Sequence, residues 1–349
     1  MTLPNNLWLA PMAGTTEPIF RALCRRFGAG LTVTELVSAR GIRYHGITPQ
    51  QYRYLEICPA EKPVLIQLFG FDPEDFRRAV AAIMDHPLLS TCTGIDINMG
   101  CPVKKVVKTG AGSALMKAPA VARSIVKAVQ AELQGTDKSI SVKFRKGFDQ
   151  DSCTAPDFAL TMAAAGVDFI CVHGRTAAQQ YGGLADRSAI AKTVRALRAR
   201  GIDLPVIANG DITGVVSARQ TLAETGADGL MVGRSAQGNP WIFRELAAGL
   251  TGYFLTDQAN PCSAAVPAAP LVARPPEPPE RCFIILEHLD GLIARLGESL
   301  AVKEMRGQLV AYFKGLPGAV AIRRQCVQVA SRADVVELLN RWRREQVQT

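Results

Sequence analysis

The segment Asn98-Met99-Gly100-Cys101-Pro102-Val103 places a cysteine directly after a short apolar run, and lysines 104, 105 and 108 follow it. Nearby ammonium groups favour a thiolate nucleophile, whereas a thiol of ordinary acidity stays protonated at neutral pH and donates a proton. A half-buried cysteine without redox activity is the structural alternative. The glycines of Gly110-Ala111-Gly112 predict a flexible loop downstream, so that Cys101 would lie on a mobile lid.

A second candidate site is Gly233-Arg234-Ser235-Ala236, which follows an apolar run and precedes a predicted helix. Glycine permits close approach of the backbone to a phosphate, N–H groups at a helix start attract anions, and arginine binds two phosphate oxygens. A simple glycine turn with a surface arginine is the structural alternative.

Four further polar residues end apolar runs: Gln67, Lys143, His173 and Asn209. A lysine buried on a strand needs an anionic partner because burial of an isolated charge is costly. A reduced flavin, which carries negative charge on its pyrimidine ring, is one such partner. A Schiff-base lysine, or a salt bridge from Lys143 to Asp96 or Asp211, would explain the position as well.

The elements that must position these residues alternate between strand and helix. We expect strands near residues 7–12, 31–35, 64–69, 95–98, 140–144, 168–173, 205–209 and 228–232, with helices such as 73–84, 120–133 and 215–225 between them. Eight nearly apolar strands alternating with helices predict an α/β fold, the (β/α)8 TIM barrel, rather than an open sheet. Because the carboxyl ends of such strands converge on one face, the candidate residues are expected to form one site.

The carboxyl-terminal part of the chain has a different composition. Residues 256–280 include seven prolines and six alanines, which is typical of a linker or loop. Beyond them we expect helices at 282–296, 300–314, 319–329 and 333–343. The predicted organisation is therefore a barrel at 1–255, a linker at 256–280 and a small all-α domain at 281–349.

Composition limits the class of protein. The chain has 349 residues, of which 48% are hydrophobic, and no apolar run long enough to span a membrane. The first residues lack the pattern of a signal peptide, so we expect a cytoplasmic protein. Nine scattered cysteines without a CxxC pair predict neither zinc nor disulfides, and we expect no metal. We also expect a monomer.

The net charge of +9 fits either ordinary solubility or a polyanionic partner. Residues 281–349 contain eleven basic and seven acidic residues, a net charge of +4. Lys303 and Arg306 stand three positions apart, on one face of a predicted helix. These cations predict an RNA surface, against the alternative of an ordinary solvated helix.

Several motifs together resemble the tRNA-dihydrouridine synthase family, and the bacterial B subgroup fits best. They are Leu9-Ala10-Pro11-Met12-Ala13-Gly14, the Cys101 motif, Gly110-Ala111-Gly112-Ser113-Ala114-Leu115-Met116, Val172-His173-Gly174-Arg175-Thr176, Asn209-Gly210-Asp211-Ile212 and Gly233-Arg234 with Gly238-Asn239-Pro240-Trp241. The resemblance is dense over residues 1–250. It continues in Val302-Lys303-Glu304-Met305-Arg306 and Gly315-Leu316-Pro317-Gly318-Ala319.

The resemblance implies FMN as bound cofactor, NADPH as reductant and tRNA as substrate, with position 17 favoured by the subgroup. Residues implied to contact FMN are Pro11, Met12, Ala13, Gln67, Lys143, His173, Asn209, Asp211, Gly233 and Arg234. Residues implied or expected to contact tRNA are Asn98, Lys104, Lys105, Arg175, Lys303 and Arg306. In the implied mechanism, FMN N5 delivers hydride to C6 of a uridine extruded from its stack, and Cys101 protonates C5.

Some residues depart from the family pattern. Arg187 stands where a tryptophan is usual, and Gly307-Gln308 replaces a usual basic pair. Two other functions remain open: a flavin barrel acting on a free pyrimidine, and an RNA-binding protein that keeps flavin as a structural group or redox sensor. The basic helical tail argues against the first, and Cys101 argues against the second.

Overall fold

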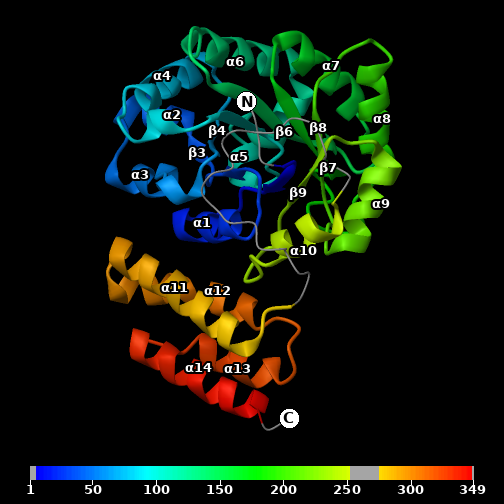
Figure 1. Cartoon of the computed structure of the whole chain (residues 1–349). Helices are drawn as coiled ribbons and strands as arrows, with labels where there is room; N and C mark the ends of the chain where they lie inside the picture. Colours follow the sequence, from blue (N-terminus) through cyan, green and yellow to red (C-terminus); the bar gives the residue numbers. More distant parts are fainter. Residues whose placement is uncertain (1–4, 252–274, 348–349) are drawn as a thin grey trace.

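The computed structural model describes residues 5–251 and 275–347, which form a barrel and a helical domain below it (Figure 1). The strands are β1 (Leu7–Leu9), β2 (Thr32–Val33), β3 (Val37–Ser38), β4 (Val64–Phe69), β5 (Gly94–Met99), β6 (Ser139–Gly147), β7 (Phe169–Thr176), β8 (Val206–Asn209) and β9 (Gly229–Val232). All pairs are parallel, in the order β1-β9-β8-β7-β6-β5-β4-β2, and β3 extends the edge of β4.

The sheet closes into a barrel between β1 and the residues before β2. Leu9 N donates to Leu31 O at 2.9 Å, and Gly30 N donates to Leu7 O at 2.6 Å. The (β/α)8 barrel predicted from the sequence is therefore confirmed. The strand expected at residues 31–35 corresponds to β2 (Thr32–Val33), and the short strand β3 (Val37–Ser38) follows beyond the predicted range.

The helices that surround the barrel follow the strands in turn. They are α1 (Pro18–Arg26), α2 (Ala39–His45), α3 (Pro49–Leu55), α4 (Pro73–Met84), α5 (Lys104–Val107), α6 (Pro119–Glu132), α7 (Ala155–Ala165), α8 (Arg187–Arg198), α9 (Val215–Thr225) and α10 (Ile242–Gly249). Three short 3-10 helices lie at Pro59–Glu61, Leu89–Thr91 and Gly112–Lys117. Proline in the first turn and an aspartate cap, as at Asp72 and Pro73 of α4, explain why such helices begin where they do.

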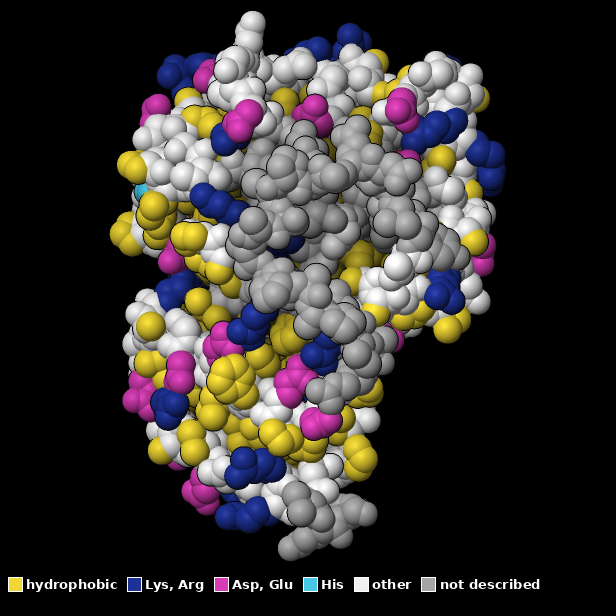
Figure 2. All heavy atoms as spheres, in the orientation of Figure 1, with side chains coloured by type: hydrophobic (Ala, Val, Ile, Leu, Met, Phe, Trp, Pro, Cys, Tyr) yellow, Lys and Arg dark blue, Asp and Glu magenta, His cyan; other side chains and the backbone are white. Residues whose placement is uncertain are grey.

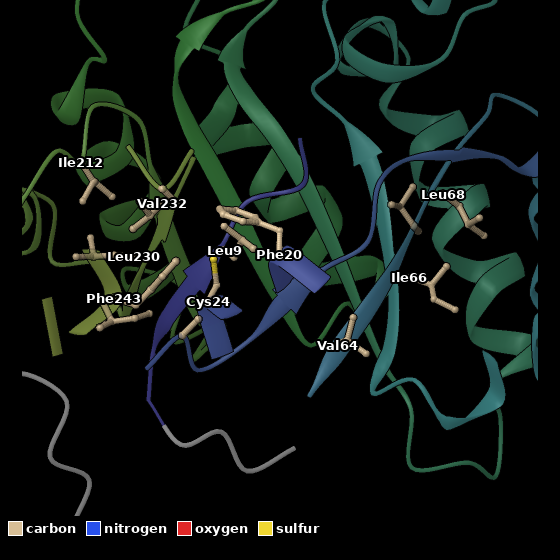
Figure 3. Packing of buried hydrophobic residues seen from close by; sticks show 14 of the residues in the cluster. Leu9, Phe20, Cys24, Val64, Ile66, Leu68, Ile212, Leu230, Val232 and Phe243 are labelled. Atoms are coloured by element: carbon tan, nitrogen blue, oxygen red, sulfur yellow. The ribbon is translucent and has the colours of Figure 1, made fainter. Parts of the chain in front are cut away.

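The core has two layers because strand side chains alternate between the two faces of the sheet. Trp8 and Phe169 meet edge to face inside the barrel, with ring centroids 4.8 Å apart. Leu9, Val64 and Val232 point outward and pack against the helices, as Figure 3 shows for the surroundings of Phe20 and Phe243.

The helical domain consists of α11 (Pro278–Leu296), α12 (Glu298–Tyr312), α13 (Ala319–Cys326) and α14 (Arg332–Val347). Helix α11 begins at Pro278, which lies within the expected linker of residues 256–280. Its two prolines occupy the first turn, where a helix does not need the missing N–H groups. Residues 256–274 of that linker lie outside the described residues. None of the described helices is long and apolar enough to cross a membrane.

The helical domain packs on the barrel through α11 and α12, which contact α1, α3 and the loop of residues 238–241. We call this interface the seam. His288 Nε2 of α11 lies 2.8 Å from Glu17 Oε1, and His288 Nδ1 lies 3.0 Å from the Tyr312 hydroxyl. A Cβ on Gly238 would lie 2.2 Å from Tyr312 N, so the two backbones touch. This close approach fixes α12 against the barrel.

Candidate functional site

Two adjoining cavities occupy the carboxyl-end face of the strands, which we call the barrel mouth. The His173 cavity, of about 280 Å³, is also lined by Asn209, Asp211, Gly233, Ser235 and Lys314. The Cys101 cavity, of about 560 Å³, is also lined by Ala13, Gln67, Asn98 and Lys104. Their common wall consists of Pro11, Met12, Lys143, Arg145, Tyr181 and Arg234. The expected convergence of strand ends is thus present.

A chain of hydrogen bonds leads from the barrel interior to Cys101. Asp96 accepts from Gln67 Nε2 at 2.6 Å and also from the Ser141 hydroxyl. Gln67 Oε1 accepts from Asn98 Nδ2 at 2.9 Å, and Asn98 Oδ1 accepts from the backbone N–H of Cys101 at 2.9 Å. Burial raises the pKa of Asp96 although Gln67 and Ser141 stabilise its charged form. Asn98 therefore positions the Cys101 loop.

Cys101 is half-buried and lines its cavity, and the downstream segment expected as a loop is partly helical. The downstream segment forms the 3-10 helix Gly112–Lys117, and Ser113 N donates to Cys101 O at 3.0 Å. Gly112 has φ +61°, and a Cβ there would lie 2.8 Å from Cys101 O. Gly112 is thus required for a close approach of two backbone segments, and the predicted mobility of the loop stays a prediction.

Lys143 lies on the wall shared by both cavities. Its Nζ donates to Asn209 Oδ1 at 3.1 Å, and Asn209 Nδ2 donates to Met231 O at 2.7 Å. Within the described residues, no carboxylate lies within ion-pair distance of Lys143, so the expected alternative of a salt bridge to Asp96 or Asp211 is wrong. Burial lowers the pKa of Lys143. An anionic ligand in the cavity would offset this cost.

Arg145 adds a second cation to the mouth beside Lys143, and His173 adds an uncharged ring. Burial, followed by the charges of Lys143 and Arg145, holds the pKa of His173 well below its ordinary value, so the ring is neutral at pH 7. Arg145 donates to the carbonyls of Gly100 and Thr176 at 2.8 and 2.9 Å. Burial lowers the pKa of Arg145 to about 10. The structure therefore groups two cations and a neutral imidazole around one space.

Asp211 and Arg175 form the rim of the His173 cavity. Arg175 donates to both carboxylate oxygens of Asp211 at 2.9 and 2.7 Å, and Arg234 donates to one at 3.0 Å. Asp211 has φ +52°, a conformation that costs about 1 kcal/mol or more and that these bonds hold in place. Only 2% of Arg175 is exposed. Its expected place on an RNA-facing surface is therefore not found, because Asp211 draws the guanidinium inward.

The loop at Gly233 lies in ordinary van der Waals contact with Ala10 and Met12. Met12 S and the Cβ position of Gly233 are 3.8 Å apart, and Ala236 N donates to Gly233 O at 2.8 Å. The loop continues as turns, and α10 begins only at Ile242. The helix expected to open directly after Gly233-Arg234 is thus absent, and the approach of this backbone to a phosphate stays a prediction.

Tyr181 was missed by sequence reasoning. Its side chain is 59% exposed and lines both cavities, with the Arg234 guanidinium 4.8 Å and the Arg145 guanidinium 5.9 Å from the ring centroid. A single aromatic residue in an irregular loop gives no periodic signal. Its exposed ring face is suited to stacking against a flat ligand.

The remaining predicted contacts lie on the surface. Lys104 and Lys105 are exposed on α5, beside the Cys101 cavity, and Lys303 is exposed on α12. Arg306 is half-buried, and its Nε donates to Val329 O at 2.9 Å, which ties α12 to the segment before α14. The structure does not bring Lys303 and Arg306 to the barrel mouth.

Two departures from the family pattern have structural partners. Arg187 pairs with Glu224 at 3.1 Å. Gln308 is buried at the seam, where its Nε2 donates to Thr15 O at 3.0 Å. Across residues 5–251 and 275–347, no group of three or more His, Cys, Asp or Glu side chains could hold a metal ion.

Comparison with known proteins agrees with this arrangement. Residues 8–347 match the family model described as dihydrouridine synthase (Dus). The chain is 39% identical over 324 residues to tRNA-dihydrouridine synthase B of Pseudomonas aeruginosa, which covers 93% of this chain and 88% of the relative. It is 37% identical over 341 residues to probable tRNA-dihydrouridine synthase 1 of a Synechocystis species, covering 97% and 87%.

Solved structures resemble the barrel more distantly. A structure of morphinone reductase in complex with tetrahydroNAD has a TM-score of 0.51 and 13% identity, and the match covers 70% of this chain and 87% of that one. A 2-naphthoyl-CoA reductase complex has a TM-score of 0.53 and 11% identity, covering 71% and 50%. These likenesses concern the fold.

Proposed function

The chain belongs to the dihydrouridine synthase family, and from this premise we propose that it reduces specific uridines of tRNA to 5,6-dihydrouridine, with FMN as bound cofactor and NADPH as reductant. The names of the relatives support tRNA as the substrate. The observation that carries the proposal is the half-buried Lys143, which faces both cavities without a carboxylate partner among the described residues.

The residues of the mouth fit a flavin. A reduced flavin is planar and carries negative charge on one ring, and Lys143 and His173 supply a cation and a ring N–H at one place. Gly233 and Arg234 would hold its phosphate, as expected for the loop after the last barrel strand.

The other residues implied for FMN would form walls and supports. Pro11 and Met12 form the wall between the cavities, Ala13 and Gln67 line the Cys101 side, and Asn209 fixes Lys143. Asp211 would act indirectly, because its carboxylate already engages Arg175 and Arg234. When bound, reduced FMN supplies the hydride that adds to C6 of the uracil.

Cys101 and its supports perform the proton step in this proposal. The Cys101 thiol lines the cavity beside the shared wall and donates its proton to C5 of the uracil. Asn98 holds the loop in place through the Cys101 N–H and is itself held by Gln67. In sum, uridine, NADPH and one proton yield dihydrouridine and NADP⁺, and solvent reprotonates the thiol.

The substrate must reach this site from a folded RNA. The target base has to leave its stack, and the exposed ring of Tyr181 at the mouth offers a stacking surface. Lys104 and Lys105 would contact phosphates beside the cavity, and Lys303 and Arg306 would belong to the RNA-binding face of the helical domain. The view of the helical domain in Figure 2 shows cations interspersed with acids and hydrophobic side chains.

The positions of these residues indicate different roles for the two domains. We assign catalysis to residues 1–255 and RNA binding to residues 281–349, in a monomer. The named relatives are bacterial, and a bacterial enzyme of tRNA acts in the cytoplasm, which is the location we propose.

The test is a dihydrouridine assay on unmodified tRNA with NADPH, read by reduction-sensitive sequencing. Purified protein should be yellow and should modify one D-loop position, with position 17 favoured. Cys101→Ala should keep the flavin and its reduction by NADPH but lose about 10²- to 10⁴-fold of tRNA turnover. Cys153→Ala, which changes an exposed cysteine away from both cavities, is the matched control and should behave as wild type.

The alternatives give different results in the same assay. A yellow protein that oxidises NADPH with free uracil or dihydroorotate but leaves tRNA unchanged would be a pyrimidine enzyme. A protein that binds tRNA without any NADPH oxidation would be a binding protein with a structural flavin.

A further inference from the structure

Lys314 comes from the helical domain, yet it lines the His173 cavity of the barrel. It follows the last residue of α12 by two positions. The other residues that line this cavity belong to the barrel, and they include Asp211, Gly233, Arg234 and Ser235. The cavity therefore has a wall that the barrel alone does not supply.

The backbone before Lys314 is fixed against the loop that carries Gly233. Tyr312 and Phe313 are buried, and Tyr312 O accepts from Arg281 Nη1 at 2.7 Å. A Cβ on Gly238, five residues after Gly233, would lie only 2.2 Å from Tyr312 N. Lys314 N donates to Ala311 O at 3.0 Å and closes the end of the helix. Packing, rather than chance exposure, sets the position of this lysine.

The charges around the cavity favour an anion near Lys314. Arg175 and Arg234 both pair with Asp211, which offsets part of their charge. The Lys314 ammonium has no ion pair or side-chain hydrogen bond within the described part of the chain. A phosphate monoester carries about −1.5 to −2 charges at pH 7, more than Arg234 alone would balance while it pairs with Asp211.

We propose that Lys314 binds the phosphate of the cofactor, so that FMN bridges the barrel and the helical domain. This inference rests on the proposed flavin site and adds a ligand from the second domain. Because coupling between two binding events is reciprocal, docking of the helical domain strengthens FMN binding, and FMN strengthens docking.

The test compares two flavins that differ by the phosphate. Apoprotein is titrated with FMN and with riboflavin, and the quenching of flavin fluorescence gives each Kd. Lys314→Gln should weaken FMN binding about 5- to 20-fold, the usual loss of one charge-assisted hydrogen bond, and should leave riboflavin binding unchanged. Lys314→Arg should restore most of the FMN affinity. Lys192→Gln removes an exposed lysine that lines neither cavity, and it should change neither Kd.

Other outcomes would overturn the inference. An equal loss for both flavins would mean that Lys314 only supports the local fold. Unchanged FMN affinity, with a slope of tRNA affinity against salt reduced by about one, would assign Lys314 to an RNA phosphate instead. A wild-type protein that binds riboflavin as tightly as FMN would have no phosphate site, whereas one that binds neither would remove the proposed flavin as well.

Discussion

Lys143 and Arg145 at the barrel mouth are balanced in a different way from the charged side chains of the seam. At the seam, Glu17 faces His288, Arg295 pairs with Glu56, and Arg53 pairs with Glu304. At the mouth, the Lys143 side chain hydrogen-bonds to the neutral Asn209 and, among residues 5–251 and 275–347, to no carboxylate, while Arg145 binds carbonyl oxygens.

This difference separates structural from functional charge. In an ion pair each charge offsets the desolvation cost of the other. A cation removed from water without a carboxylate partner lowers the stability of the folded protein unless an anionic ligand binds beside it. Burial lowers the pKa of Lys143 because desolvation disfavours its charged form. The charges of the seam thus have partners within the protein, whereas the charge of Lys143 at the mouth would be balanced by an anionic ligand.

The largest expected effect comes from removing the cation of the mouth. Lys143→Met should lower turnover on tRNA about 10²- to 10³-fold, because one preorganised group that stabilises developing charge is lost. The free energy of unfolding of the apoprotein should not fall, because a half-buried charge with no carboxylate partner among the described residues is replaced by an apolar chain of similar length. Urea titration and the tRNA assay measure the two quantities.

Lys127→Met, on the exposed face of α6, provides the control for Lys143→Met and should leave turnover unchanged. A large loss of stability in Lys143→Met would contradict the comparison, because Lys143 would then be a structural group like those of the seam.

The opposite pattern is expected at the seam. Glu17→Gln should lower the free energy of unfolding by about 3 kcal/mol at pH 7, because His288 loses its charged partner in a buried place. The flavin absorption spectrum should not change. Burial raises the pKa of Glu17, but His288 and the N–H groups of Ile19 and Phe20 outweigh burial, so the net pKa is lowered.

The lowered pKa of Glu17 fixes the sign of a pH dependence. Its stabilising effect is present above the ordinary pKa of glutamate and is lost as the pH falls through the lower value of the folded state. The difference in stability between wild type and Glu17→Gln should therefore shrink as the pH falls below about 4. A difference that grows on acidification would contradict the pairing with His288.

The smallest expected effect concerns the exposed lysines 104 and 105, for which the described part of the chain offers no ion-pair partner. Replacing Lys104 and Lys105 together by alanine should weaken tRNA binding several-fold and reduce the slope of log affinity against log salt by about 1.4 to 1.8. Replacing Arg123 and Lys127 of α6 by alanine is the control, because it removes two positive charges from a surface that lines neither cavity. It should leave the slope unchanged. Equal effects of both pairs would mean that only net charge matters.

Much of the fold followed from periodicity. The bounds expected for α4 and α9 agree with the structure, and the eight-stranded barrel is present. Because parallel strands end on one face, Lys143 and Asn209 were expected to lie together, and they share a hydrogen bond. Their roles toward a cofactor remain proposals.

What the sequence did not indicate depends on contacts between distant segments. Arg175 is buried because Asp211, in a left-handed conformation, lies within reach of it. Tyr181 belongs to an irregular loop. Lys314 lines the mouth because the absence of a Cβ at Gly238 lets the backbone of Tyr312 pack close to it. None of these relations follows a period along the chain.

The most direct test of the central claim is a single turnover without oxygen. The flavin-loaded protein is reduced with one equivalent of NADPH, then mixed with unmodified tRNA, and flavin absorbance and dihydrouridine are followed together. The account predicts that tRNA accelerates reoxidation of the flavin and that about one dihydrouridine forms per flavin. Reoxidation at the same rate with and without tRNA, and no dihydrouridine, would contradict it.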